Sequence, residues 1–142
     1  MKIRKARKTD LKEILELFNS SFNLTGDDNL RYKAYHIKEY IEGPIFNTFV
    51  AEINKEIIGV VLIIIFKKAK YLYVENLIVK KEFRKSGVAS NLESYVENIA
   101  KKNKLNLIYF YSEENNKAMA KLSKKLKFIE GKKWSFFWKE IK

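Results

Sequence analysis

The chain has 142 residues, of which 46% are hydrophobic and 14% aromatic, so it can bury a continuous core and is too apolar to be largely disordered. It contains no cysteine, which excludes disulfides, thiolate metal sites and a cysteine nucleophile. The formal net charge of +12 invites an anionic partner, but only four basic residues are arginines and the lysines are spread along the chain, which favours a solvated surface over a dedicated nucleic-acid site.

The first residues and the apolar runs of the sequence bear on the cellular location of the protein. Residues 1–10 are rich in lysine and arginine and lead into no apolar stretch, unlike a secretory signal. The longest apolar run, residues 57–66, is far shorter than the roughly 20 residues of a membrane-spanning helix. No repeat or proline-rich linker marks a boundary. We therefore expect a single cytoplasmic domain over residues 1–142, with no membrane contact.

In chain order, the pattern begins with a strand and two helices. Residues 3–6 suit a short strand, after which Asp10 and Glu13 carry the signature of a capping box that opens a helix. A second helix is expected over residues 29–41, where apolar side chains recur at helical spacing until the Gly-Pro pair at 43–44.

Strands follow in the middle of the chain. Residues 49–53 and 56–66 are apolar and rich in β-branched side chains, and the Asn-Lys pair between them suits a tight antiparallel hairpin. Residues 71–79 predict another strand. From Gly87 to about residue 102 the apolar period becomes helical.

The last part of the chain predicts a strand, a helix and a strand. Residues 105–111 suit a strand, Asn115 or Asn116 can cap a helix that ends near residue 126, and residues 134–141 read as the closing strand. The sum is a mixed α/β fold with the order β-α-α-β-β-β-α-β-α-β.

The segment from residue 79 to 89, VKKEFRKSGVA, lies between a predicted strand and a predicted helix. Gly87 and the small Ala89 let backbone N–H groups approach an anion, and the start of the helix adds its positive end. Arg84 and Lys85 supply neighbouring charge. This segment predicts a phosphate cradle.

The cradle resembles the signature of the GNAT superfamily of N-acetyltransferases, a strand that ends in valine, a short turn, and R/Q-x-x-G-x-G/A at the head of a helix. The resemblance extends through the order of elements, the ENLIV strand at residues 75–79, and residues 116–128, which are similar to the family's N-x-x-A…Y-x-x-x-G-F region. It implies one GNAT-like domain with a central, mostly antiparallel twisted sheet flanked by helices. It also implies transfer of an acetyl group from acetyl-CoA to a primary amine of a small molecule or protein, by direct attack in a ternary complex and without a metal.

The resemblance further implies which residues bind the cofactor. The strand is expected to splay after Glu75, so that backbone groups of Leu77 and Val79 meet the pantetheine arm and the Val79 N–H meets the thioester carbonyl. Asn116 is a candidate contact of the cofactor arm, and the alternative, helix capping, accounts for the residue fully. The implied cofactor-binding residues are Leu77, Ile78, Val79, Arg84, Lys85, Ser86, Gly87, Val88, Ala89, Ser90 and Asn116.

Two carboxylates are candidates for the general base that an amine nucleophile requires. Glu75 occupies a strand position where family members often carry a glutamate that acts directly or through water, and Glu52 is the weaker candidate. The alternative for Glu75 is a surface carboxylate or a structural pair with a lysine.

The general acid is the point at which the sequence departs from the family. Ser123 stands where many members carry a tyrosine that protonates the leaving thiolate, and Lys127 stands where they carry glycine. Ser123 could bond the sulfur or hold a water. Tyr109 and Tyr111 are other hydroxyls in reach, unless they belong to the core.

For the acceptor, Asp27, Asp28 and His36 are candidate substrate contacts, because the first two helices wall the acceptor pocket in this family. The alternatives are a solvated turn for the aspartates and an exposed helix position for the histidine. The identity of the amine and the formation of a homodimer stay open. Two rival classes stay open as well: a non-catalytic acyl-CoA-binding module, which Ser123 favours, and a nucleic-acid-associated protein, which only the charge favours.

Overall fold

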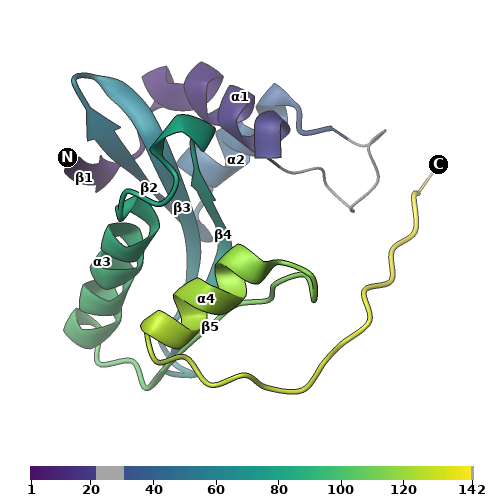
Figure 1. Cartoon of the computed structure of the whole chain (residues 1–142). Coiled ribbons are helices and arrows are strands. Elements are labelled where there is room, and N and C mark those ends of the chain that lie inside the picture. Colours follow the sequence, from purple (N-terminus) through teal and green to yellow (C-terminus); the bar gives the residue numbers. More distant parts are fainter. Residues whose placement is uncertain (22–30, 142) are drawn as a thin grey trace. The chain divides into compact units, whose positions relative to one another are not determined.

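The computed structural model describes residues 1–21 and 31–141, which separate into two units, Met1–Tyr111 and Ser112–Lys142 (Figure 1). The first unit holds a sheet and the helices that cover it, and the second holds one helix and the chain that follows. Candidate substrate contacts Asp27 and Asp28 lie outside the described residues.

Five strands in the order β1-β2-β3-β4-β5 form the sheet of the first unit. Strands β1 to β4 pair antiparallel and β5 runs parallel to β4. The β2–β3 hairpin turns at Asn54 and Lys55, whose φ values of 50° and 66° fit a type I′ turn. The strands are β1 Lys2–Lys5, β2 Phe46–Ile53, β3 Glu56–Phe66, β4 Tyr71–Val79 and β5 Leu107–Tyr109.

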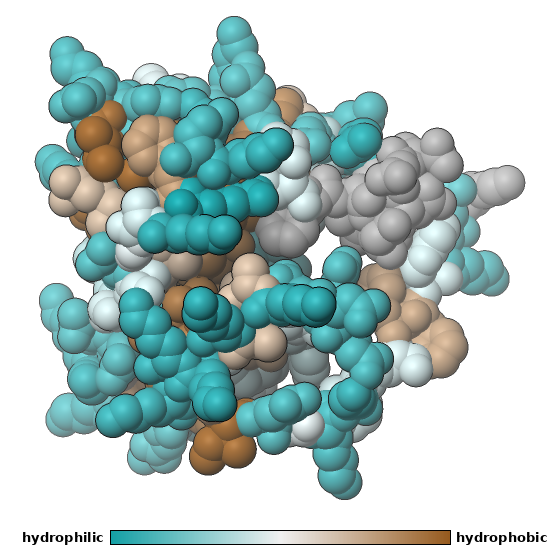
Figure 2. All heavy atoms as spheres, in the orientation of Figure 1, coloured by the Kyte–Doolittle hydropathy of each residue, from teal (hydrophilic) through white to brown (hydrophobic). Residues whose placement is uncertain are grey.

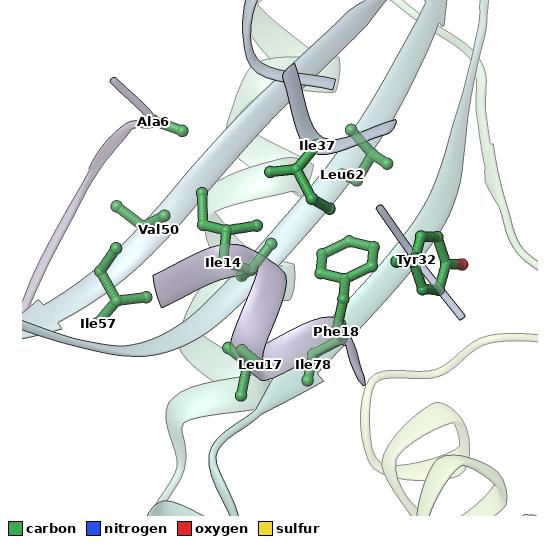
Figure 3. Close-up of a cluster of buried hydrophobic side chains, with 11 residues drawn as sticks. Ala6, Ile14, Leu17, Phe18, Tyr32, Ile37, Val50, Ile57, Leu62 and Ile78 are labelled. Atoms are coloured by element: carbon green, nitrogen blue, oxygen red, sulfur yellow. The ribbon is translucent and has the colours of Figure 1, made fainter. Parts of the chain in front are cut away.

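Helices cover both faces of this sheet. α1 (Leu11–Ser21) and α2 (Ala34–Glu42) lie on one face, where Ile14, Phe18 and Ile37 pack against Val50 and Leu62 (Figure 3). α3 (Val88–Lys102) lies on the other face and buries one apolar stripe there. Because β3 is covered on both sides, it reads in the sequence as an almost unbroken apolar run. The mixed α/β class with a mostly antiparallel sheet is confirmed.

The starts of α1 and α2 differ from the prediction. The Asp10 carboxylate accepts the Arg7 N–H at 2.7 Å, in a short 3₁₀ turn (Lys8–Asp10) before α1, and Glu13 instead accepts the Ile57 N–H. The expected capping box between these two acids is therefore wrong, because each carboxylate has another donor. α2 begins at Ala34, later than the expected start near residue 29. At this start, His36 Nδ1 accepts the Lys33 N–H at 2.8 Å.

The second unit contains α4 (Lys117–Lys125), which Asn116 caps by accepting the Met119 N–H at 3.1 Å. Residues 134–141, expected as the closing strand, have no strand structure and expose Trp134 and Phe137 by 76% and 88%. That expectation is wrong for the structure described here. The segment is rich in aromatic side chains, which favour strands, but a strand also needs a hydrogen-bonding neighbour, and no described strand pairs with this segment.

Hydrophilic side chains cover most of the face in Figure 2, as expected for a chain so rich in lysine. Among the described residues, no helix is both long and apolar enough to cross a bilayer.

Candidate active site

β4 contains a β-bulge at Glu75. In the β3–β4 ladder, Leu62 lies opposite Asn76 and Ile63 lies opposite Val74, so Glu75 is an extra residue. Side chains alternate between the faces of a strand, and one extra residue therefore reverses the alternation beyond it. Val74 packs in the α3 cluster, whereas Ile78 packs in the α1–α2 cluster.

The part of β4 beyond the bulge has a free side. Pairing with β5 covers only Tyr71 to Tyr73, and no described strand pairs with residues 74–79 on that side. The Lys80 N–H donates to the Ile58 carbonyl of β3 at 2.9 Å. Because backbone groups alternate along a strand, the amides of Leu77 and Val79 point away from β3, to the free side. Ile78 differs, since its backbone faces β3 and its side chain is buried.

After β4 the chain makes a second 3₁₀ turn (Lys81–Phe83) and then the predicted cradle. Lys85 and Gly87 have φ values of 63° and 88°, in the left-handed region that glycine adopts without strain. The Asn91 N–H makes the first bond within α3, to the Gly87 carbonyl at 3.0 Å. The amides of Val88 and Ala89 come before that bond, where helix amides lack an acceptor within the helix. The segment thus has the backbone of an anion site.

Arg84 lies at the edge of the cradle and braces it. Its Nε donates to the Val79 carbonyl at 3.1 Å, and its Nη2 reaches Ser21 Oγ at 3.4 Å. The guanidinium therefore ties the loop to the end of β4 and to α1. Ser86 is also used locally, because its Oγ donates to the Phe83 carbonyl.

Three tyrosines lie near enough to Glu75 to interact with its charge. Burial raises the pKa of Tyr32, Tyr40 and Tyr73, and the negative charge of Glu75 raises each of them further. Tyr73 also has a hydrogen bond to Glu75, and its ring stacks on that of Tyr109 with centroids 5.0 Å apart. These phenols stay protonated at neutral pH, so Glu75 is a carboxylate among hydroxyl donors.

The other candidate base is occupied. Glu52 accepts from Arg4 Nε at 2.9 Å, and the same arginine donates to Asp10 at 2.7 Å. All three side chains are largely buried at the β1–β2 edge. Glu52 is therefore part of a structural ion-pair network, and Glu75 is the better candidate of the two.

The remaining predicted residues are held within their own elements. In the second unit, Ser123 Oγ donates to the Met119 carbonyl at 2.7 Å, and Asn116 caps α4. In the first unit, His36 caps α2 and lies against Tyr35, with ring centroids 4.2 Å apart. The described residues contain no group of three side chains that could hold a metal ion.

Sequence reasoning missed Tyr73 and Tyr40 as neighbours of Glu75. Tyr73 could have been found, because it lies two residues before Glu75 on the same strand and so shares its face. Tyr40 could not, since nothing in the sequence of α2 shows which strand residue its ring approaches.

Solved structures of similar fold include two aminoglycoside acetyltransferases and a protein described as a transcriptional regulator. Aminoglycoside 6'-N-acetyltransferase AAC(6')-IG from Acinetobacter haemolyticus matches with a TM-score of 0.78 and 21% identity over 100% of both chains. AAC(6')-Iy, solved with a bisubstrate analogue, CoA-S-monomethyl-acetylneamine, matches with a TM-score of 0.78 and 20% identity over 99% of this chain and 98% of that one.

A third similar structure, described as a transcriptional regulator from Bacillus halodurans C-125, has a TM-score of 0.76 and 20% identity over 95% of this chain and 99% of that one. Such identities establish a shared fold and not a shared substrate. A model of the Acetyltransferase (GNAT) family matches residues 11–128, which is most of the sequence, and this chain therefore belongs to that family.

Proposed function

We propose that the protein is an N-acetyltransferase that passes an acetyl group from acetyl-CoA to a primary amine by direct attack in a ternary complex. The observation that carries the proposal is the continuous segment from Glu75 to Ala89, in which a bulged carboxylate, the open side of β4 and an anion cradle follow one another. Each of the three corresponds to one requirement of the reaction: a base, a groove for the donor arm, and a phosphate site.

The cradle would hold the pyrophosphate of the donor. The amides of Val88 and Ala89 and the N-terminal end of α3 supply hydrogen bonds and partial positive charge. Lys85, which is exposed beside them, supplies a full charge. Ser86 and Ser90 flank the same turn, and Asn116 stays a proposed contact of the donor arm.

The open side of β4 would hold the thioester end. The Leu77 amide and carbonyl offer strand-like hydrogen bonds to the pantetheine arm. The Val79 amide would then donate to the thioester carbonyl oxygen, where negative charge develops as the amine adds. The Ile78 side chain contributes packing beneath this strand.

Glu75 would remove a proton from the incoming ammonium, directly or through a water, because only the neutral amine attacks. Formation of the N–C bond gives a tetrahedral oxyanion with a positively charged nitrogen; the nitrogen loses its extra proton to solvent, and collapse of the oxyanion breaks the C–S bond and leaves the amide. The departing thiolate, with a thiol pKa of about 8.5, takes a proton from a hydroxyl donor or from solvent. Tyr109, Tyr111 and Ser123 are the candidate donors.

The acceptor is best described as a small-molecule amine, since similar structures include enzymes named for aminoglycosides. A protein amine remains an alternative. His36, Asp27 and Asp28 are proposed acceptor contacts. We place the enzyme in the cytoplasm and keep a homodimer as an open assembly.

A non-catalytic acyl-CoA-binding module is the second candidate. The observation that favours it is Ser123, whose hydroxyl proton is already donated to the Met119 carbonyl. A protein of this kind would keep the cradle and lose turnover.

Calorimetry with acetyl-CoA, followed by a thiol-release assay against a panel of primary amines, tests both candidates. We expect saturable binding and amine-dependent release of CoA. Binding without release would favour the non-catalytic module. Gly87→Glu is the matched control. A Cβ at this position would meet only Asn91 Nδ2, at 3.8 Å, so the substitution adds negative charge and backbone strain without a steric clash. Acetyl-CoA binding should therefore be lost. Unchanged affinity in a folded Gly87→Glu protein would contradict the whole proposal.

A further inference from the structure

A hollow of about 880 Å³ lies between α3 and the sheet, at the end of the first unit away from the cradle. α3 begins beside the cradle at Val88 and reaches this end at Lys102, where the β3–β4 turn also lies. The hollow is wide open to solvent, so a ligand would lie along it as in a groove. We call this hollow the basic groove. Its lining residues lie on the segment before β2, on β2, on β3 and the following turn, and on α3, among them Phe49, Ile65, Lys67, Tyr95 and Lys102.

The floor of the basic groove is apolar and aromatic. The rings of Phe49 and Tyr95 meet edge to face, with centroids 5.1 Å apart. Ile65 from β3 and Ile99 from α3 continue the floor toward the turn, and all four side chains are only partly buried. The floor therefore presents apolar surface that an alkyl chain or an aromatic ring would cover.

The rim of the basic groove is cationic at the turn end. Lys67, Lys68 and Lys102 line it, and no lining residue is acidic. Within the described parts of the chain, none of these three lysines forms an ion pair. An anion placed here would meet ammonium groups without displacing a carboxylate.

The end of α3 does not oppose an anion at this rim, although helix C-termini carry partial negative charge. The Ile99 carbonyl accepts from both the N–H and Nδ2 of Asn103. The Ala100 carbonyl accepts the Leu105 N–H, and the Lys101 carbonyl accepts the Lys104 N–H. These carbonyl groups therefore already have donors, and the nearest full charges at this rim are those of the lysines.

We propose that the basic groove binds a small amphiphilic anion, with a carboxylate or phosphate head at the lysines and an apolar body on the Phe49–Tyr95 floor. Tyr95 and Lys102 lie seven residues apart on α3, a rise of about 10 Å along the helix axis, so the apolar body and the charged head of the ligand would be separated by a medium-length chain. A second copy of this protein is a poor occupant, because a symmetric contact would bring the three lysines toward like charges.

Titration of the ¹⁵N-labelled protein with decanoate, without acetyl-CoA, tests this inference independently of the acetyltransferase proposal. We expect saturable amide shifts at Tyr95, Ile99 and Lys102. Decanol and decyltrimethylammonium, which have the same chain without the negative charge, should bind at least about tenfold more weakly, the equivalent of 1.4 kcal/mol. Equal binding of the three compounds would overturn the proposal.

Charge-reversal variants complete the test. Lys67→Glu combined with Lys102→Glu should weaken decanoate binding more than tenfold, and Lys12→Glu, an exposed lysine on α1, should leave it unchanged. Two results would overturn the proposal: decanoate shifts confined to the cradle amides of Ser86 and Gly87, or binding to phosphatidylglycerol vesicles with none to soluble decanoate. The second result would identify a membrane contact instead of a ligand site.

Discussion

At the scale of single residues, Glu75 combines two properties that a catalytic base needs. Its side chain shares the face of Tyr73 and interacts with Tyr32 and Tyr40, and these protonated tyrosines provide donors but no competing positive charge. In the described residues, no ion pair engages it, in contrast to Glu52.

Replacing Glu75 by glutamine should separate catalysis from binding. The amide keeps the shape of the side chain but cannot accept the proton, so turnover should fall by about 10²- to 10⁴-fold, while acetyl-CoA affinity stays the same. The acidic limb of the pH–rate profile should disappear. Steady-state kinetics from pH 5 to 9, with calorimetry for the cofactor, would measure both effects.

Glu16→Gln is the matched control, because Glu16 is an exposed residue of α1 and the same chemical change there should alter nothing. If both variants keep full activity, Glu75 is not the base and its carboxylate has a structural role.

Ser123 is expected to matter little. Its hydroxyl donates to the Met119 carbonyl one turn earlier in α4, so its proton is committed within the helix. Ser123→Ala should lower turnover by less than about fivefold, in line with the roughly 1 kcal/mol of a neutral hydrogen bond. A loss of activity as large as that of Glu75→Gln would instead identify Ser123 as the proton donor.

At the scale of elements, the contact between β3 and α3 depends on Gly59. A Cβ there would lie 3.0 Å from Val88 Cγ1 and 3.1 Å from Leu92 Cδ1, so glycine allows the helix to lie close against the strand. The cradle precedes α3 directly, and its position therefore depends on this approach.

Gly59→Val should push the start of α3 away from the sheet. We expect a loss of about 1–3 kcal/mol in the free energy of unfolding, the usual cost of overpacking, together with weaker acetyl-CoA binding. Urea denaturation and calorimetry would measure the two. Gly131→Ala is the control, because a Cβ at Gly131 has no atom within 4 Å. Normal cofactor affinity in Gly59→Val would show that the cradle does not depend on how closely α3 lies.

The sequence was informative where structure depends on neighbours along the chain. The tight β2–β3 hairpin, the amphipathic faces of α1 and α3 and the glycine of the cradle follow from local rules, and the structure contains them. The bulge at Glu75 could not be predicted, because a bulge is a mismatch between two strands. The same limit explains the missing strand at residues 134–141 and the bond from the Ile57 N–H to Glu13, both of which depend on partners far away in the sequence.

At the scale of the whole molecule, one buried acid should give stability an unusual dependence on pH. Glu93 of α3 is 5% exposed, and its Oε1 has no hydrogen-bond partner among the described residues. Burial raises its pKa to about 7, whereas an unfolded glutamate titrates near 4.3. The folded protein therefore holds this proton more tightly than the unfolded chain does.

The contribution of Glu93 to stability is then greatest below about pH 4 and is lost as the pH rises toward 7, by up to about 3 kcal/mol. Glu93→Gln has no titrating group at this position. Relative to the parent, its free energy of unfolding should therefore increase as the pH rises from 5 to 8. Urea denaturation at four pH values would measure the difference. Glu97→Gln, an exposed position on the same helix, should run parallel to the parent at every pH. A constant difference between Glu93→Gln and the parent would show that Glu93 titrates normally.

The open side of β4 leaves an unpaired strand edge among the described strands of the sheet. Unpaired strand edges accept other extended chains, and most proteins protect them with charge, proline or a covering element. Here the same amides of Leu77 and Val79 that would recognise the donor arm also form such an edge. A bound pantetheine would act as a temporary sixth strand. The cellular supply of acetyl donor would then govern how long this protein resists aggregation, as well as how fast it works.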